Sequence, residues 1–207
     1  MKPDEIEQLS FKIIDREAGA HDFTPEQWEI VRRMIHTTAD FDYKQIVRFH
    51  ADAVRTGIQA IQNGRQIITD TNMARVGIRK TDLAQCGVQV SCLMNEPSIH
   101  ERAKAAGSTR AKAAVDAAAA DMEGGIYVVG NAPTALLRLV ELIKADKARP
   151  ALVIGLPVGF VNAAESKSAL MELDYPYISN EGRKGGSNVA ASAVNALSIL
   201  ALRQSGV

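Results

Sequence analysis

The chain has 207 residues, of which 46% are hydrophobic, and its 24 basic residues balance its 24 acidic ones. This length fits one domain, or one domain with a helical extension. Zero net charge argues against nucleic acid as a partner, because domains that bind it are usually strongly basic. The longest apolar stretch, 151–161, is far shorter than the roughly 20 residues of a membrane helix. The acidic N-terminus does not resemble a secretory signal, so we expect a cytoplasmic protein without a membrane segment.

Three helices are predicted in the first 64 residues. Apolar residues at helical spacing indicate a helix over Asp4–Ala18. Thr24 begins the second, because it is followed by a proline and then by a glutamine at the third helical position, and this helix ends near Thr37 or Thr38. The third covers His50–Asn63 and stops at a glycine.

Strands and helices alternate in the rest of the chain. The predicted strands are Gln66–Thr69, Val88–Leu93, Ile126–Val129, Ala151–Ile154 and Tyr177–Ser179. Helical patterns lie at about 71–76, 98–106, 110–122, 134–145 and 162–172, and a last helix covers Ser187–Gln204. This alternation predicts an α/β protein with a mainly parallel, five-stranded sheet that is doubly wound, flavodoxin-like and covered by helices on both faces. We expect a single domain over 1–207, with an N-terminal helical part at 1–64 and an α/β core at 65–207.

The two cysteines, Cys86 and Cys92, are expected to remain reduced. Six residues of a strand span about 20 Å, whereas a disulfide needs Cα atoms roughly 6 Å apart. Neither a CxxC motif nor a Cys/His cluster suggests zinc, and we expect no metal site.

Three glycine loops stand where predicted strands give way to helices, at 130–135, 155–161 and 181–187. A strand, a glycine turn and a helix start in this order turn backbone N–H groups outward, and these groups favour anions. One such loop alone is best explained by turn geometry. Three loops at one sheet edge predict a floor for a large ligand with many negative charges. The side chains expected to bind its carboxylates are Arg110, Asn131, Thr134, Arg183, Lys184 and Ser187.

A nucleotide or flavin site is the alternative on grounds of fold. Gly155 and Gly159 match neither the dinucleotide fingerprint nor the Walker motif, and Lys167 lies too far from Gly155 to act as a Walker lysine. A flavodoxin-like flavin- or nucleotide-binding enzyme therefore stays open only as an analogy of fold.

His36 is the leading catalytic candidate. It lies at the end of the second predicted helix, three residues after Arg33, which places both side chains on roughly one face. Histidine suits acid–base work because its ordinary pKa is near 6.5. A histidine that only caps the helix end is the alternative. Asp40 and Asp42 are expected to cap the next turn, to face solvent or to orient the imidazole.

The sequence also predicts roles for two other residues, one at a strand end and one in the segment after the second glycine loop. Asp70 ends a predicted strand and is expected to line the pocket, and Lys167 is expected to be structural or interfacial.

The sequences of these loops resemble those of one protein family. GNAPTAL at 130–136, GLPVGFVNAAESK at 155–167, GRKGGS at 182–187 and Arg-Met-Ile-His at 33–36 are similar to the precorrin-8X methylmutase family of corrin biosynthesis. The similarity covers nearly all of the chain, in the same order, and leaves nothing for a second domain.

The resemblance implies an isomerase that moves a methyl group from C-11 to C-12 of a precorrin-8-type corrinoid, giving hydrogenobyrinic or cobyrinic acid in cobalamin biosynthesis. It implies His36 as the catalytic general acid, Arg33 and Ser10 as substrate contacts, a homodimer, and no cofactor. A non-catalytic protein that binds corrinoids or other tetrapyrroles is the alternative. The sequence does not decide whether the substrate carries cobalt.

Overall fold

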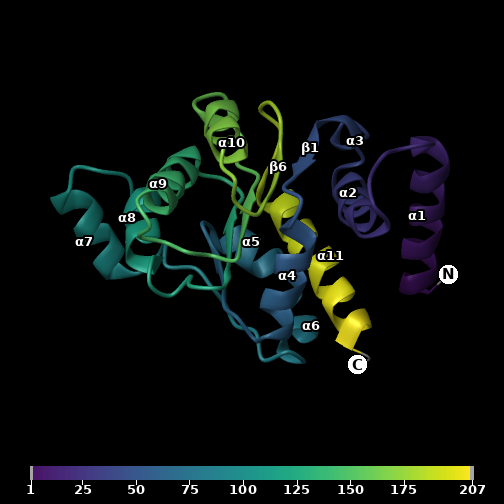
Figure 1. The fold of residues 1–207 in the computed structure, drawn as a ribbon, viewed down its shortest axis with the longest axis horizontal. Helices are drawn as coiled ribbons and strands as arrows, with labels where there is room; N and C mark the ends of the chain where they lie inside the picture. Colours follow the sequence, from purple (N-terminus) through teal and green to yellow (C-terminus); the bar gives the residue numbers. More distant parts are fainter. Residues whose placement is uncertain (1, 206–207) are drawn as a thin grey trace.

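The sheet contains six strands, and five of them are parallel. The computed structural model describes residues 2–205 (Figure 1). The strands are β1 (Val47–Phe49), β2 (Ile67–Thr69), β3 (Val90–Ser91), β4 (Ile126–Val129), β5 (Leu152–Gly155) and β6 (Tyr177–Asn180). Their spatial order is β1-β6-β5-β4-β2-β3, with β1 antiparallel to β6 and all other pairs parallel. Counted along the chain, the parallel strands therefore have the order 2-1-3-4-5, which is the flavodoxin order.

The predicted α/β fold with a mainly parallel sheet is confirmed, and the sixth strand is the difference. β1 adds an antiparallel edge, with Val47 opposite Asn180 and Phe49 opposite Ile178. Three residues are too few to display the period-two alternation that identifies a strand, and this one follows the single-turn helix α3 (Tyr43–Ile46) directly.

Helices cover both faces of the sheet. One face carries α4 (Ala53–Gln62), α5 (Asn72–Gly77), α6 (Lys80–Ala84) and α11 (Ser187–Ser205), and the other carries α8 (Arg110–Ala118), α9 (Pro133–Lys144) and α10 (Ala163–Met171). Outer layers follow: α7 (Pro97–Ala105) packs on α8, α2 (Pro25–Thr38) packs on α11, and α1 (Pro3–Ala18) packs on α2. Figure 1 accordingly shows α7 and α1 at opposite ends of the molecule. Across residues 2–205, no helix combines the length and apolar character needed to cross a bilayer.

Alternation along the buried strands divides the core in two. Ile67, Ile126 and Ile154 pack with the helices on the α11 side, while Ile68 and Val153 pack with those on the α9 side. Burial on both faces explains why these strands consist mainly of Ile, Val and Leu. The helix α11 is buried along most of its length, and its many alanines let it lie close to the sheet.

The helix that carries His36 begins and ends with clear signals. Thr24 Oγ1 accepts a hydrogen bond from the Gln27 N–H at 3.2 Å, and the Gln27 side chain accepts one from the Thr24 N–H at 3.0 Å. This reciprocal capping box is the predicted one. The helix stops at Ala39, which adopts the left-handed conformation with φ of 53°. His36 therefore lies in the last turn of α2.

Candidate active site

The loops after β4, β5 and β6 meet at the carboxyl edge of the sheet. A Cβ on Gly130 would come within 2.7 Å of Ser187 Cα, and one on Gly185 within 2.3 Å of the Leu156 carbonyl oxygen. The Gly186 N–H also donates to the Leu156 carbonyl at 2.9 Å. Glycine is thus required because one backbone passes directly against another, and the three predicted loops form one contiguous surface.

A buried carboxylate occupies the N–H groups of the first loop. Asp70, only 2% exposed, follows β2, and its Oδ1 accepts a hydrogen bond from the Gly130 N–H at 2.8 Å. Its Oδ2 accepts from the N–H groups of Asn131 at 2.9 Å and Ala132 at 2.8 Å. Burial raises the pKa of the Asp70 carboxyl, and the three N–H donors oppose that rise. Asp70 therefore binds backbone inside the protein instead of lining a pocket, and these N–H groups are occupied.

The other residues expected to bind ligand at this edge differ in exposure. Ser187 is buried, with its hydroxyl oxygen 2.8 Å from that of Thr71. Asn131 and Arg110 are exposed, and Thr134 is partly exposed. The hydroxyl of Thr134 lies 3.3 Å from that of Thr109, the residue before Arg110, so the starts of α8 and α9 are adjacent. Asn131, Thr134 and Arg110 thus share one accessible corner.

The loop after β6 is tied to the loop after α2. The Lys184 ammonium forms ion pairs with Asp40 and, at 2.7 Å, with Asp42. The hydrogen bond from Lys184 lowers the pKa of Asp40, and the two carboxylates raise the pKa of Lys184. From the sequence, Asp40 was expected to cap the next turn, to face solvent or to orient the imidazole, and nothing pointed to a partner 144 residues away.

Lys167 supports the same loop from inside. This side chain of α10 is 0% exposed, and its Nζ donates to the Lys184 carbonyl oxygen at 2.5 Å and to Asn180 Oδ1 at 3.3 Å. The Asn180 amide in turn donates to the carbonyl oxygens of Glu181 at 2.8 Å and Lys184 at 2.9 Å. Burial lowers the pKa of Lys167 to about 8. Lys167 therefore has the structural role, one of the two, structural or interfacial, that the sequence predicts.

The helices α1 and α2 bring the remaining candidates together around Phe11. The ring centroids of His36 and Phe11 are 5.3 Å apart, and the Arg33 guanidinium lies 5.1 Å from the Phe11 ring centre. Arg33 also pairs with Glu7 at 2.8 Å. Ser10, next to Phe11, donates its hydroxyl to the Ile6 carbonyl at 2.8 Å. His36 is exposed, so its imidazole is accessible from solvent.

Apolar side chains are exposed beside the basic loop. Phe160 is 86% exposed and Val161 77%, and the Arg183 guanidinium lies 5.5 Å from the Phe160 ring centre. An exposed aromatic ring next to a cation is suited to a ligand or a partner surface that is apolar and anionic at once.

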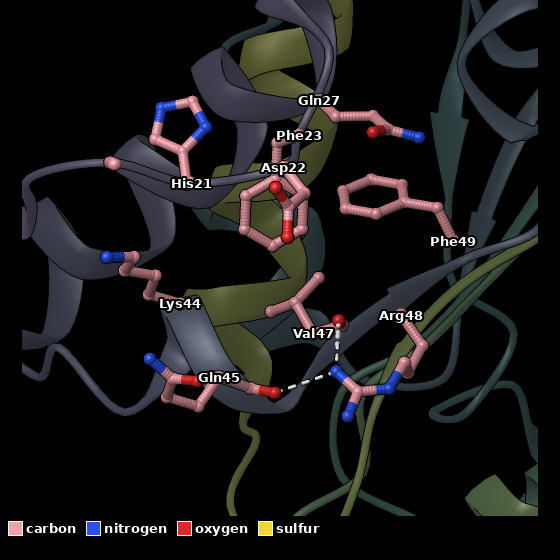
Figure 2. Close-up of a pocket in the computed structure, with 10 residues that line it drawn as sticks. His21, Asp22, Phe23, Gln27, Lys44, Gln45, Val47, Arg48 and Phe49 are labelled. Atoms are coloured by element: carbon pink, nitrogen blue, oxygen red, sulfur yellow. Dashed lines mark hydrogen bonds between the residues drawn. The ribbon is translucent and has the colours of Figure 1, made fainter.

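A separate cavity of about 460 Å³ lies between the segment 20–23 and the edge strand β1, and Figure 2 shows its lining. None of the predicted site residues lines it. Its cations already have partners inside the protein: Arg48 donates to the carbonyl oxygens of Gln45 and Val47, and Lys44 donates to that of Ala18 at 2.5 Å. We assign no ligand to this cavity.

The structure thus groups the candidates into a helical set and an edge set. Ser10, Arg33 and His36 form the first, and Arg110, Asn131, Thr134, Arg183, Lys184 and Ser187 form the second. Asp40, four residues after His36, joins the two sets through Lys184. Within residues 2–205, His, Cys, Asp and Glu side chains nowhere gather in threes as metal ligands would, and Cys86 and Cys92 are free thiols.

Comparison with known proteins finds similarity to one family over nearly all of the chain. A family model described as precorrin-8X methylmutase matches residues 5–200. The chain is 47% identical over 201 residues to a cobalt-precorrin-8 methylmutase of Priestia megaterium, covering 97% of this chain and 89% of that protein. It is 44% identical to one from Leptospira interrogans, covering 96% and 94%. A crystal structure of the precorrin-8X methylmutase from Thermus thermophilus superposes with a TM-score of 0.92 at 50% identity, covering 97% of each chain.

Proposed function

The chain belongs to the precorrin-8X methylmutase family and is an isomerase of cobalamin biosynthesis, and on this premise we propose that it moves a methyl group from C-11 to C-12 of a precorrin-8-type corrinoid with His36 as general acid. The product would be hydrogenobyrinic acid, or cobyrinic acid where the ring carries cobalt. One bond to the methyl carbon breaks and another forms in the same molecule, so atoms and electrons balance without a co-reactant. The chain's task is to hold the ring and to make it electron-poor along the migration path.

The observation that carries the role of His36 is its position. The imidazole is exposed in the last turn of α2, and the loop that follows is tied by Asp40 to Lys184 of the edge set. An acid near a ring nitrogen or carbon withdraws electrons when it donates its proton and takes the proton back after migration. A positioned acid of this kind supplies about 10²–10⁴ in rate.

The other candidates suit a ring fringed with carboxylates. We propose that Ser10 and Arg33 contact the ring or its substituents near His36. The edge set would bind acetate and propionate groups, with Arg110, Arg183 and Lys184 forming charge-assisted hydrogen bonds. Asn131 and Thr134 would add neutral ones. Ser187 is buried against Thr71, so its contribution would need that pair to open.

The two parts of the chain, 1–64 and 65–207, would act as one domain, because His36 comes from the first and the carboxylate-binding loops from the second. We further propose a cytoplasmic homodimer. Exposed apolar side chains such as Ile6, Leu9 and Phe160 provide surface for self-association. Sedimentation equilibrium decides this point: a mass equal to one chain at micromolar concentration would contradict the dimer.

Cobalt belongs to the substrate in this proposal. Two relatives at 47% and 44% identity carry the name cobalt-precorrin-8 methylmutase, which favours the cobalt-loaded ring.

The visible absorption spectrum tests the proposed reaction, because the methyl shift changes the conjugated system. Purified protein is mixed separately with the metal-free and the cobalt-loaded substrate, and the spectrum is followed over time. We expect conversion of the cobalt-loaded ring to be the faster. Binding without spectral conversion of either substrate would instead indicate a non-catalytic corrinoid-binding protein.

A further inference from the structure

The edge of this sheet contains the position where doubly wound proteins usually bind an anion, and a side chain of the protein occupies it. Strands β2 and β4 are neighbours, yet the chain leaves β2 toward β3 on one side and returns to β4 on the other. Ligands of such sheets bind at this switch point, beyond the carboxyl ends of the strands. Asp70 follows β2 and Gly130 follows β4 at this place.

We propose that Asp70 is an internal anion that fills the switch-point site and positions the segment 130–134 for substrate, and this rests on the proposed role of Asn131 and Thr134. Both carboxylate oxygens are used: Oδ1 by the Gly130 N–H, and Oδ2 by the N–H groups of Asn131 and Ala132, all at 2.8–2.9 Å. Three backbone donors converging on one carboxylate reproduce the way in which loops of this kind hold a phosphate.

The arrangement is long-range, which distinguishes it from an ordinary helix cap. A capping Asp normally accepts from N–H groups two or three residues further along its own helix. Here the acceptor lies 60 residues before Gly130, while Ala132, the residue at the cap of α9, has no side chain able to accept. Asp70 therefore fixes where α9 begins relative to the end of β2.

The neighbouring residue extends this bracing to a third element. Thr71 lies 2.8 Å, oxygen to oxygen, from Ser187 at the start of α11 and caps α5 by accepting from the Ala74 N–H at 3.2 Å. Gly130 also packs closely against the Ser187 backbone. One dipeptide, Asp70-Thr71, thus sets the relative positions of the starts of α5, α9 and α11.

Burying a carboxylate costs free energy, and the charge-assisted hydrogen bonds that it accepts from the three backbone N–H groups offset that cost. The consequence for ligand choice is direct. The three N–H groups are not available to a phosphate or to a substrate carboxylate, so ligand must be held by the exposed side chains around them. A mononucleotide would find its usual anion site filled, which argues against the flavin or nucleotide alternative.

The proposal is tested by removing the Asp70 carboxylate and supplying a small carboxylate in solution. In Asp70→Ala the space of one carboxylate is left, and formate fits it, whereas acetate carries an extra methyl group. We expect the amide NMR signals of Gly130, Asn131 and Ala132 to move in Asp70→Ala and to return toward their wild-type positions with formate more than with acetate. We expect kcat/KM to fall by roughly 10–100-fold, since a displacement of about 1 Å has effects of this size, and formate to restore it in part.

Controls separate positioning from simple destabilisation. Asp116→Ala removes an exposed carboxylate that pairs with Arg138 on the surface, and it should respond to neither anion. Asp70→Asn keeps the shape but presents an amide to backbone donors, so kcat/KM should fall at least tenfold with formate giving no rescue. If Asp70→Ala does not fold, this second variant decides, and wild-type kcat/KM in Asp70→Asn would overturn the proposal.

The two possible failures are distinguishable. If the amide NMR signals of a folded Asp70→Ala variant do not move when formate is added, the proposal of an internal anion is overturned, whatever the activity of the wild type. Full activity in a folded Asp70→Ala variant would overturn the positioning role. A wild-type protein that converts neither corrinoid would overturn the proposed function, while the amide signals would still report on the internal anion.

Discussion

The helix pair α1–α2 and the edge loops place charge in opposite ways. In the helix pair, His36 is exposed. The Arg33 guanidinium lies over the Phe11 ring and forms an ion pair with Glu7. At the edge, Asp70 and Lys167 are buried and form no ion pair within residues 2–205, and backbone and amide groups bind them instead. The proposed acid therefore lies on an accessible surface, while the buried groups Asp70 and Lys167 hold the backbone of the edge loops.

This difference predicts two classes of variant. A change at His36 in the helix pair should remove activity and leave stability nearly intact, because exposed side chains contribute little to folding. A change at Asp70 or Lys167 should alter stability, its pH dependence and loop position together, because buried charges are strongly coupled to their surroundings.

The largest expected effect follows from His36→Ala. Turnover should fall by about 10²-fold or more, since a positioned acid contributes about 10²–10⁴, while substrate binding and the melting temperature remain close to wild type. Stopped-flow absorption separates binding from conversion. His100→Ala is the matched control, because His100 is an exposed histidine on α7, at the other end of the molecule. Equal turnover in the two variants would remove His36 from the mechanism and blur the contrast between the regions.

Sequence predicted the elements that carry their own signals. The capping box at Thr24 fixed the start of α2, and β4 was predicted with the bounds it has. The edge strand β1 was missed because it becomes a strand only by pairing with residues of β6 that lie 129–133 positions later in the chain. For the same reason Asp70 was expected to line a pocket: its donors come from a segment 60–62 residues later, and no local pattern names them.

The candidate site divides along the same line. Sequence motifs identified His36 and the three glycine loops, and the fold brings the loops to one edge of the sheet as expected. The ion pairs of Lys184 with Asp40 and Asp42 could not be predicted, because they depend on how α2 packs against α11 and hence on the whole fold. The sequence showed which residues could bind or react, but it did not show which partner each charged side chain would find in the fold.

The second prediction concerns Lys167 and pH. Its pKa is about 8 in the folded protein, below the value of 10.5 that an unperturbed lysine has. Between these two values the unfolded chain binds the proton and the folded one does not, so stability contributed by this group rises with pH. Relative to Lys167→Met, the wild type should gain about 3 kcal/mol of unfolding free energy from pH 8 to 10.5, at about 1.4 kcal/mol per pKa unit.

Urea unfolding of both proteins across this pH range measures the difference. Lys144→Met serves as the control, because Lys144 is exposed at the end of α9 and its removal should leave the pH profile parallel to that of the wild type. Parallel profiles for wild type and Lys167→Met would mean that the buried ammonium is not strained, and the contrast between the two regions would then rest on Asp70 alone.

The smallest effects are expected within the edge set itself, where two neighbouring cations differ in their partners. Arg183 contacts the Phe160 ring, and it forms no ion pair within residues 2–205, whereas Lys184 already pairs with Asp40 and Asp42. A substrate carboxylate gains a free cation at Arg183 but must compete with two carboxylates at Lys184. Arg183→Gln should therefore raise KM by roughly tenfold, the value of one charge-assisted hydrogen bond.

Lys184→Gln should raise KM by only about two- to threefold and lower the melting temperature by less than about 4 °C, as exposed ion pairs contribute little. Steady-state kinetics of both variants, with kcat nearly unchanged, would support carboxylate binding at the edge. The reverse order, with Lys184→Gln the more damaging and kcat also reduced, would mean that Lys184 acts by holding the α2–α3 loop behind His36. In that case Lys184 would support the position of His36, and the helix pair and the edge loops would not have separate roles.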